Sequence, residues 1–187
     1  MAHFHSGSIQ FYTPAEAKFH RGISTVEMVI TMGLLMVIVG ITSVSLIRAK
    51  HSRTQAQCAA NLHSIGMAFA YYSQDYHDSY PVPNPLAQWE DLLREYVPRS
   101  TFHCSADNEL FAALSSSYDW RDTGNSQTTL AGKLAMQVAH TDAALAFDAL
   151  PGWHQQGKIQ VLHVDTSVDM MNLGAFFRDM QRSPTQP

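Results

Sequence analysis

The stretch "RGISTVEMVITMGLLMVIVG", residues 21–40, opens a long apolar run that carries one acid, Glu27, near its start. From Met28 to Ile47, twenty residues follow without an ionisable side chain. At about 1.5 Å per residue, a helix of that length covers roughly 30 Å, which is the hydrocarbon thickness of a bilayer. A carboxylate beside such a segment costs free energy, so its presence calls for a functional reason.

Three interpretations compete for this run. A cleaved secretory signal would have a shorter apolar core followed by small residues at a cleavage site, and a buried core helix is the second alternative. The length of the run and the basic segment behind it, "RAKHSRTQAQ" (48–57), favour a retained single transmembrane helix. The basic residues on its two sides nearly balance, so charge alone does not fix its orientation.

An apolar stripe continues beyond the run at steps of four and three residues. Its members are Cys58, Leu62, Ile65, Phe69, Tyr72 and Tyr76. This spacing puts them on one face of a helix. Because no proline lies between Pro14 and Pro81, we predict one helix over 23–77. Its first half (23–47) is apolar throughout and its second half (48–77) is amphipathic.

The residues after the helix, 78–180, predict a small globular head. We expect a short amphipathic helix within 86–98 and a surface loop over 119–133, which is rich in Gly, Ser, Thr, Asn and Gln. Three apolar runs predict strands: 143–150, 158–164 and 167–171. The last two, separated by Asp165 and Thr166, predict a hairpin.

The expected fold is therefore α+β, with a long N-terminal helix whose amphipathic half packs on a small antiparallel sheet. Residues 1–22 are polar and unpatterned and are predicted to be a leader, while 181–187 is predicted to be a disordered tail.

The head is acidic and contains both cysteines. Residues 54–187 carry seven Lys and Arg against fourteen Asp and Glu, a balance that argues against a nucleic-acid partner. Cys58 and Cys104 predict a disulfide if the head lies in an oxidising compartment, and two reduced, buried thiols are the alternative. Neither cysteine has a zinc-type spacing.

Four residues near the hairpin, Asp148, His154, His163 and Asp165, are weak candidates for a divalent-ion site, calcium included. Their spacing matches no catalytic metal motif. The chain also has no nucleophile elbow and no Gly-rich phosphate loop. We expect no catalytic residue and no cofactor.

The N-terminal segment "KFHRGISTVEMVITMGLLMVIVG" (18–40) resembles the signature of type IV prepilins and related proteins. That signature has a basic leader ending in Gly, a bulky apolar residue after the cleavage point, and Glu at the fifth mature position. Gly22, Ile23 and Glu27 match these positions. The chain departs from the pattern in having Ile23 where Phe is usual, and in lacking a proline within the mature helix.

The head is similar to pseudopilin-like proteins of type II secretion. "CAANLHSIGMAFAYYSQD" (58–75) resembles their "CxNNLKQIGLAxxxYxxD" pattern, and "FHCSAD" (102–107) resembles "FxCPSD". "GWHQQGKIQVLHVDTSVDMM" (152–171) is similar to the closing "RHxGGxNVLFADGHVxxL", with Thr166 in place of the glycine. These matches follow one another in order along most of the chain.

The resemblance implies a structural subunit of a type II secretion-like pseudopilus, not an enzyme. Prepilin peptidase would cleave after Gly22, and the new amine of Ile23 would meet Glu27 of a neighbouring subunit. The chain would cross the bacterial inner membrane once, with its head in the periplasm, before joining a periplasmic filament. Its implied partners are prepilin peptidase, other copies and related pseudopilins, the inner-membrane assembly platform and, before assembly, membrane lipid. No nucleic acid is expected.

Two alternatives remain open at this point. One is a type IV pilin that serves adhesion, motility or DNA uptake. The other, of a different class, is a single-span membrane enzyme or binding module with a His/Asp site in the head.

Overall fold

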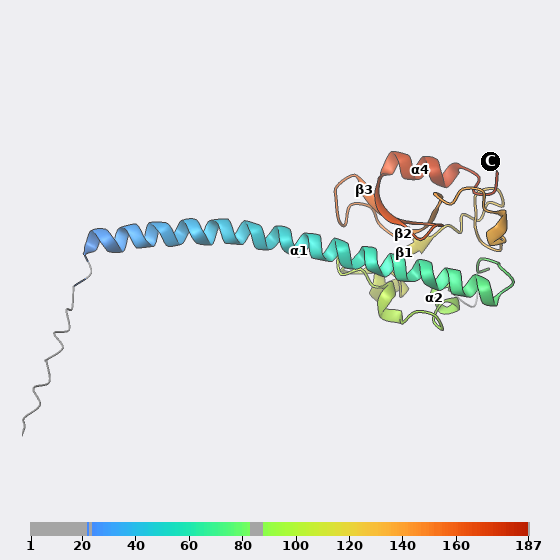
Figure 1. Cartoon of the computed structure of the whole chain (residues 1–187), viewed down its shortest axis with the longest axis horizontal. Coiled ribbons are helices and arrows are strands. Elements are labelled where there is room, and N and C mark those ends of the chain that lie inside the picture. The colour runs from blue at the N-terminus through green and yellow to red at the C-terminus, as the bar shows by residue number, and fades with distance from the viewer. Residues whose placement is uncertain (1–21, 23, 83–87, 187) are drawn as a thin grey trace, which may run out of the picture. The chain divides into compact units, whose positions relative to one another are not determined.

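The computed structural model describes residues 22, 24–82 and 88–186 (Figure 1). Its contacts divide the chain into two units, Met1–Val44 and Ser45–Pro187. Helix α1, Thr25–Asp75, contributes residues to both. The prediction of one long helix is confirmed, with described ends within two residues of those expected; Ile23 lies outside the described residues.

In the first unit, α1 is helical from Thr25 onward and every described side chain is exposed. Its hydroxyl groups bond back onto the helix. Thr31 Oγ1 donates to the carbonyl of Glu27 at 2.9 Å, and Thr42 Oγ1 donates to that of Ile38 at 2.8 Å. Ser43 Oγ donates to the carbonyl of Val39 at 2.7 Å. These polar side chains therefore satisfy their hydrogen bonding within the helix and need no water.

The second unit combines the rest of α1 with a sheet and short helices. Its further elements are α2 (Trp89–Leu92), η1 (Arg99–Phe102), α3 (Leu110–Leu114), β1 (Tyr118–Trp120), η2 (Ala135–Gln137), β2 (Ala144–Asp148), β3 (Lys158–His163), β4 (Val168–Asn172) and α4 (Leu173–Gln181). The four strands pair in chain order, and every pair is antiparallel. The small antiparallel sheet is confirmed.

The sheet lies between two helices (Figure 1). On one face, the buried stripe of α1 packs with Leu145 of β2 and Leu162 of β3. On the other face, Phe147 and Val161 pack with Phe176 of α4. Successive strand residues point to opposite faces, so alternate residues of β3 contribute to the cores on the two faces of the sheet. The predicted packing of the amphipathic helix half on the sheet is confirmed.

Two predictions about the head are corrected. The surface loop predicted over 119–133 is present only over 122–127, which are exposed and lie outside any helix or strand. At its ends, β1 includes Trp120, and Arg121 and Leu130 have no exposed surface. The predicted amphipathic helix within 86–98 is helical only as α2, although Trp89 and Leu93 are buried as its spacing implied. Turns follow α2 directly and end at Pro98, which cannot donate a backbone hydrogen bond.

The predicted disordered tail is also corrected. The preceding residues form α4, and Pro184 is buried. The carbonyl of Pro184 accepts hydrogen bonds from the amides of Ala139 and His140, at 2.9 and 3.3 Å. Arg121 donates to the carbonyl of Arg182 at 2.7 Å. The buried charge of Arg121 thus helps to order a segment whose composition alone suggests disorder.

The predicted hairpin is present between β3 and β4, with a three-residue turn. The amide of Thr166 donates to the carbonyl of His163 at 2.9 Å, and the amide of His163 donates to that of Ser167 at 2.8 Å. Thr166 has a φ of 68°, a left-handed conformation that usually requires glycine. The Asp165 carboxylate accepts from the amide and hydroxyl of Ser167, at 2.9 and 2.6 Å. Asp165 is therefore engaged in holding the turn.

A glycine sets how closely α1 approaches the sheet. A Cβ added at Gly66 would lie 2.8 Å from Leu162 Cδ1, and Leu162 is fully buried. Overfilling such a site typically costs about 1–3 kcal/mol. Alanine favours the helix by about 0.5–1 kcal/mol, which offsets part of this cost. We therefore expect Gly66→Ala to lower the unfolding free energy by about 1–2 kcal/mol, measured by denaturation of the detergent-solubilised chain followed by near-ultraviolet circular dichroism.

Gly174→Ala is the matched control, because a Cβ there would lie no closer than 3.6 Å to its nearest atom, Arg178 Nη1. This change lies inside α4 and should leave stability unchanged or raise it by up to about 1 kcal/mol. Equal effects of the two substitutions would contradict close packing at Gly66.

Candidate functional site

The first candidate site is the start of α1, where the motif residues lie. Gly22 is exposed and lies outside the helix. Glu27 is in the first turn of α1, where a negative charge interacts favourably with the helix dipole. Within the described residues, no hydrogen bond or ion pair engages its carboxylate. Ile23 lies outside the described residues.

An apolar surface follows Glu27 along the same helix. Large exposed hydrophobic side chains between 26 and 47 are Val26, Met28, Val29, Ile30, Met32, Leu34, Leu35, Met36, Val37, Ile38, Val39, Ile41, Val44, Leu46 and Ile47. This segment is long and apolar enough to cross a membrane, and none of it is buried within the chain. So much contiguous apolar surface is unfavourable in water and needs an apolar environment.

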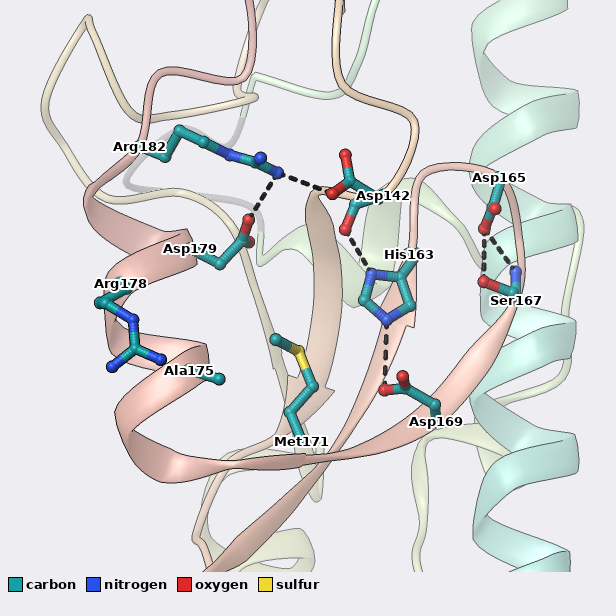
Figure 2. A pocket seen from close by; sticks show the side chains of 10 residues that line it. All are labelled: Asp142, His163, Asp165, Ser167, Asp169, Met171, Ala175, Arg178, Asp179 and Arg182. Carbon is teal, nitrogen blue, oxygen red and sulfur yellow. Dashed lines mark hydrogen bonds and ion pairs between the residues drawn. The ribbon is translucent and has the colours of Figure 1, made fainter.

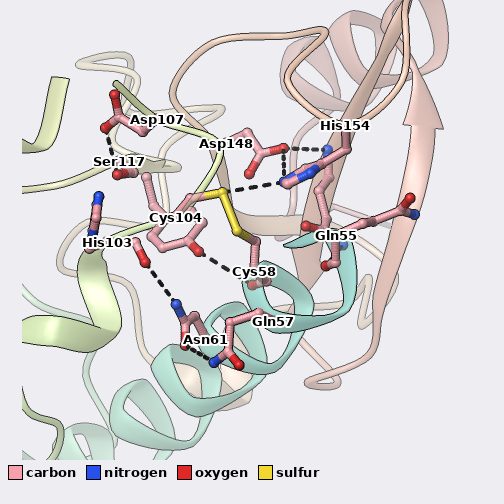
Figure 3. The surroundings of a disulfide bond; sticks show 12 residues. Gln55, Gln57, Cys58, Asn61, His103, Cys104, Asp107, Ser117, Asp148 and His154 are labelled. Atoms are coloured by element: carbon pink, nitrogen blue, oxygen red, sulfur yellow. Dashed lines mark hydrogen bonds and ion pairs between the residues drawn. A yellow bond between two sulfur atoms is a disulfide. The ribbon is translucent and has the colours of Figure 1, made fainter. Parts of the chain in front are cut away.

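The second candidate site surrounds the cysteines (Figure 3). Cys58 of α1 and Cys104, which follows η1, form a disulfide, and neither has exposed surface. The bond ties α1 to the head across 46 positions of sequence. In the chain-entropy account, closing a loop of this length stabilises the fold by about 4 kcal/mol.

Two ionisable side chains lie against this disulfide. His154 Nε2 is 3.4 Å from Cys104 Sγ, and Asp148 Oδ2 is 3.9 Å from the same ring nitrogen. The amide of Gln160 donates to Asp148 Oδ2 at 3.1 Å. The side chains of His154 and Asp148 are 0% and 2% exposed. A histidine and a carboxyl group have thus been withdrawn almost completely from water beside the sulfur atoms.

Several polar atoms in this cluster have no hydrogen-bond partner among the described residues. They are Asp148 Oδ1, His154 Nδ1 and Gln160 Oε1. Leaving a buried polar atom unpaired costs about 1–3 kcal/mol. A disulfide does not require such neighbours, so the cluster is costly for a purely structural bond.

Burial favours the uncharged form of both ionisable groups. Desolvation raises the pKa of Asp148 to about 7, although the hydrogen bond from the Gln160 amide partly opposes it. Desolvation also lowers the pKa of His154, and repulsion from His51 lowers it further. The 3.9 Å separation of Asp148 and His154 is longer than a hydrogen bond. The two side chains therefore do not act as a strong ion pair.

The four predicted metal ligands do not gather in one place. Asp148 and His154 lie at the disulfide, on the α1 side of the sheet, whereas His163 lies at a cleft on the α4 side. Asp165 bonds to Ser167 in the hairpin turn. Alternation along the strands separates His163 from Asp148. Within the described residues, these four weak candidates therefore do not form one site.

The third candidate site is that cleft, with a volume of about 510 Å³, between the hairpin and α4 (Figure 2). His163 Nδ1 lies 2.6 Å from the carbonyl oxygen of Asp142, and Nε2 lies 3.2 Å from Asp169 Oδ1. Arg182 pairs with Asp142 at 3.1 Å and with Asp179 at 3.0 Å. Most of these groups pair with one another, although Arg182 Nε has no partner among the described residues. The cleft therefore chiefly joins α4 to the sheet.

Sequence reasoning missed the buried ion pair that supports this cleft. Arg121 Nη1 lies 2.8 Å from Asp179 Oδ2, with the arginine side chain fully buried. Arg121 stands next to a polar stretch with no hydrophobic period, and no sequence signal marks it as buried. Asp169 was missed for another reason: alternation in β4 places it on the face of Met171, but does not identify His163 as its partner.

Comparisons with protein-family models, curated proteins and solved structures found no match to this chain. The three sites therefore rest on their own residues. The start of α1 is an exposed apolar surface with one acid. The disulfide cluster is a buried set of sulfur, imidazole and carboxyl groups, and the cleft is a network of paired charges.

The raised pKa of Asp148 predicts a dependence of stability on pH. Its carboxyl group titrates near pH 4 when unfolded and near pH 7 when folded. The folded state therefore binds the proton more tightly, and the contribution of Asp148 to stability falls as pH rises from about 4 to about 7. Asp148→Asn should remove this loss, so the variant should gain stability relative to the parent across that window, by at most about 4 kcal/mol.

The measurement is the unfolding free energy of both chains at several pH values. The lowered folded pKa of His154 makes both chains more stable as pH rises toward about 6.5, which opposes the effect of Asp148. Because this contribution is present in the parent and in Asp148→Asn, it largely cancels when their unfolding free energies are subtracted. Asp165→Asn is the control, since hydrogen bonds from Ser167 lower the pKa of Asp165 and its effect is confined to pH below about 4. A constant difference between the parent and Asp148→Asn across the window would contradict the raised pKa.

Proposed function

We propose that this chain is a prepilin-like structural subunit of a type II secretion-like pseudopilus. Prepilin peptidase cleaves it after Gly22, and residues 23–47 then anchor it in the inner membrane with the head in the periplasm. An assembly platform extracts it into a filament with other copies and related pseudopilins. The chain acts by assembly and not by catalysis.

The observation that carries this proposal is the contrast between the two halves of α1. From Thr25 to Ile47 the helix is apolar and wholly exposed, whereas Cys58, Leu62 and Ile65 are completely buried in the head. An exposed apolar helix suits lipid first and the packed interior of a filament later. Both settings bury it, so transfer between them can be nearly balanced in free energy.

Glu27 sets the axial register between neighbouring subunits when the helix leaves the lipid and enters the filament. In hydrocarbon an unpaired carboxylate is penalised by about 2.5–3.5 kcal/mol at the bilayer centre, and somewhat less near the end of the span. The amine of Ile23 exists only after cleavage at Gly22, and it can pair with Glu27 of a neighbouring subunit. Because pairing removes the penalty, it favours one axial position between subunits and rejects the others.

The processing step is tested by co-expressing the chain with a prepilin peptidase and determining its intact mass and N-terminal sequence. We expect a mature chain that begins at Ile23. Gly22→Val should abolish cleavage, because the peptidase must accept the residue before the cut. Gly33→Val, in the same helix beyond the cut, is the control and should be cleaved normally. A parent chain that retains its first 22 residues would contradict the proposal.

Assembly is tested with Glu27→Gln in a cell that provides the assembly machinery. Cleavage should be unchanged, because the cut precedes Ile23. The filament fraction recovered by shearing should fall at least about tenfold, since even 1.4 kcal/mol per contact corresponds to that factor. Glu95→Gln changes an exposed carboxylate of the head instead and should leave the yield unchanged. Normal filament yield from Glu27→Gln would show that Glu27 does not set the register.

A further inference from the structure

We propose that the buried cluster at the disulfide is also a metal site. When the Cys58–Cys104 bond is reduced, the two thiolates and His154 bind a Zn²⁺ ion, and Asp148, whose Oδ2 lies 3.9 Å from His154 Nε2, borders the site. The cluster therefore has two closed states, a disulfide when oxidised and a zinc site when reduced. This inference concerns the head alone and does not depend on the proposed filament.

The ligand atoms are already gathered. Cys58 Sγ, Cys104 Sγ and one ring nitrogen of His154 lie within 4.8 Å of one another. The nitrogen closest to sulfur is Nε2, at 3.4 Å from Cys104 Sγ. Around tetrahedral zinc, with bonds of about 2.3 Å to sulfur and about 2.0 Å to nitrogen, such ligand atoms are roughly 3.5–3.8 Å apart. To reach that geometry, the two sulfur atoms must separate to about 3.8 Å once reduction has broken the bond between them.

The chemistry of the neighbours points to a metal. Thiolate and imidazole are the ligands that zinc prefers in closed structural sites, and a carboxylate is an accepted fourth ligand. Asp148 Oδ2 is 3.9 Å from His154 Nε2, and Asp148 Oδ1 has no partner among the described residues. His154 Nε2 already faces Cys104 Sγ at 3.4 Å, and imidazole binds a metal through such a ring nitrogen. A disulfide alone needs none of these groups.

A second pocket, of about 280 Å³, adjoins the cluster and offers a route for the ion. Its lining includes Thr54, one helical turn before Cys58, and Ser105 and Trp153, which directly neighbour Cys104 and His154. His51 lines the same pocket and provides an imidazole on the way in. The described cysteines are themselves fully buried, so an ion reaches them through local opening at this pocket.

The redox step balances with an external dithiol as reductant. The dithiol donates two electrons and two protons, the Cys58–Cys104 bond breaks to two thiols, and the dithiol becomes a disulfide. Zn²⁺ then displaces the two thiol protons and forms two zinc–sulfur bonds. A disulfide oxidant reverses the sequence: it accepts two electrons and two protons and becomes a dithiol, while the two thiolates form the Cys58–Cys104 bond and release Zn²⁺.

The test uses the full chain, without an affinity tag, purified in detergent. Oxidised and reduced samples are incubated with Zn²⁺, freed of excess metal and assayed for bound zinc by mass spectrometry. We expect one ion per reduced chain and none per oxidised chain beyond a weak background. With Co²⁺ as probe, the reduced chain should show thiolate-to-cobalt absorption in the near ultraviolet, which surface histidines cannot produce.

His154→Gln should reduce the zinc affinity of the reduced chain at least about tenfold, consistent with loss of one ligand. His163→Gln is the matched control, since it alters a buried histidine of the same head outside the cluster. Equal zinc affinity in His154→Gln and the parent would overturn the proposal, as would equal uptake by oxidised and reduced chains.

Near-ultraviolet circular dichroism of the reduced chain separates loss of the site from loss of the fold. If the reduced, metal-free head unfolds and Zn²⁺ restores its spectrum, the proposal is supported. If it remains folded without binding zinc, or unfolds and is not restored by zinc, the proposal is overturned.

Discussion

The packing of the amphipathic half of α1 on the sheet is the interaction from which the rest of the head follows. Gly66 lets the helix backbone approach Leu162, where an added Cβ would lie 2.8 Å from Leu162 Cδ1. The Cys58–Cys104 bond holds the helix to the segment after η1. Because this contact uses one face of the sheet, the other face is free for α4. The late strands thus become the centre of a three-layer head.

What could be predicted from the sequence is what depends on periodicity over a long segment. The stripe from Cys58 to Tyr72 repeats often enough to identify one face of a helix, and that face is buried. The strands around 143–150 and 158–164 can be predicted because they are short apolar runs between turn residues. The disulfide is predicted only for an oxidising compartment, with two reduced thiols as the alternative, since two cysteines do not reveal their distance; the structure has the bond. Tyr76 was assigned to the stripe but is exposed just beyond the helix end.

What could not be predicted depends on contacts between distant residues. Arg121 is buried because Asp179 and two carbonyl groups of the C-terminal segment receive its hydrogen bonds, and nothing local in "DWRDTGN" indicates this. The four weak metal candidates do not meet, because strand alternation puts Asp148 and His163 on opposite sides of the sheet. The contact between His154 and the cysteines is not predictable from the sequence because it joins distant residues: 50 positions separate His154 from Cys104.

The two parts of α1 meet opposite requirements with the same backbone. A helix satisfies its own backbone hydrogen bonds, so it is stable both in lipid and against a protein core, and only its side chains need to change. Thr31, Thr42 and Ser43 show the adaptation in the apolar half, because their hydroxyls bond to carbonyls one turn back. Glu27 cannot be satisfied in this way, since a carboxylate only accepts hydrogen bonds and the carbonyls within its helix offer no donor. Under the proposed function, the amine of Ile23 on a neighbouring chain supplies the donor that these carbonyls cannot.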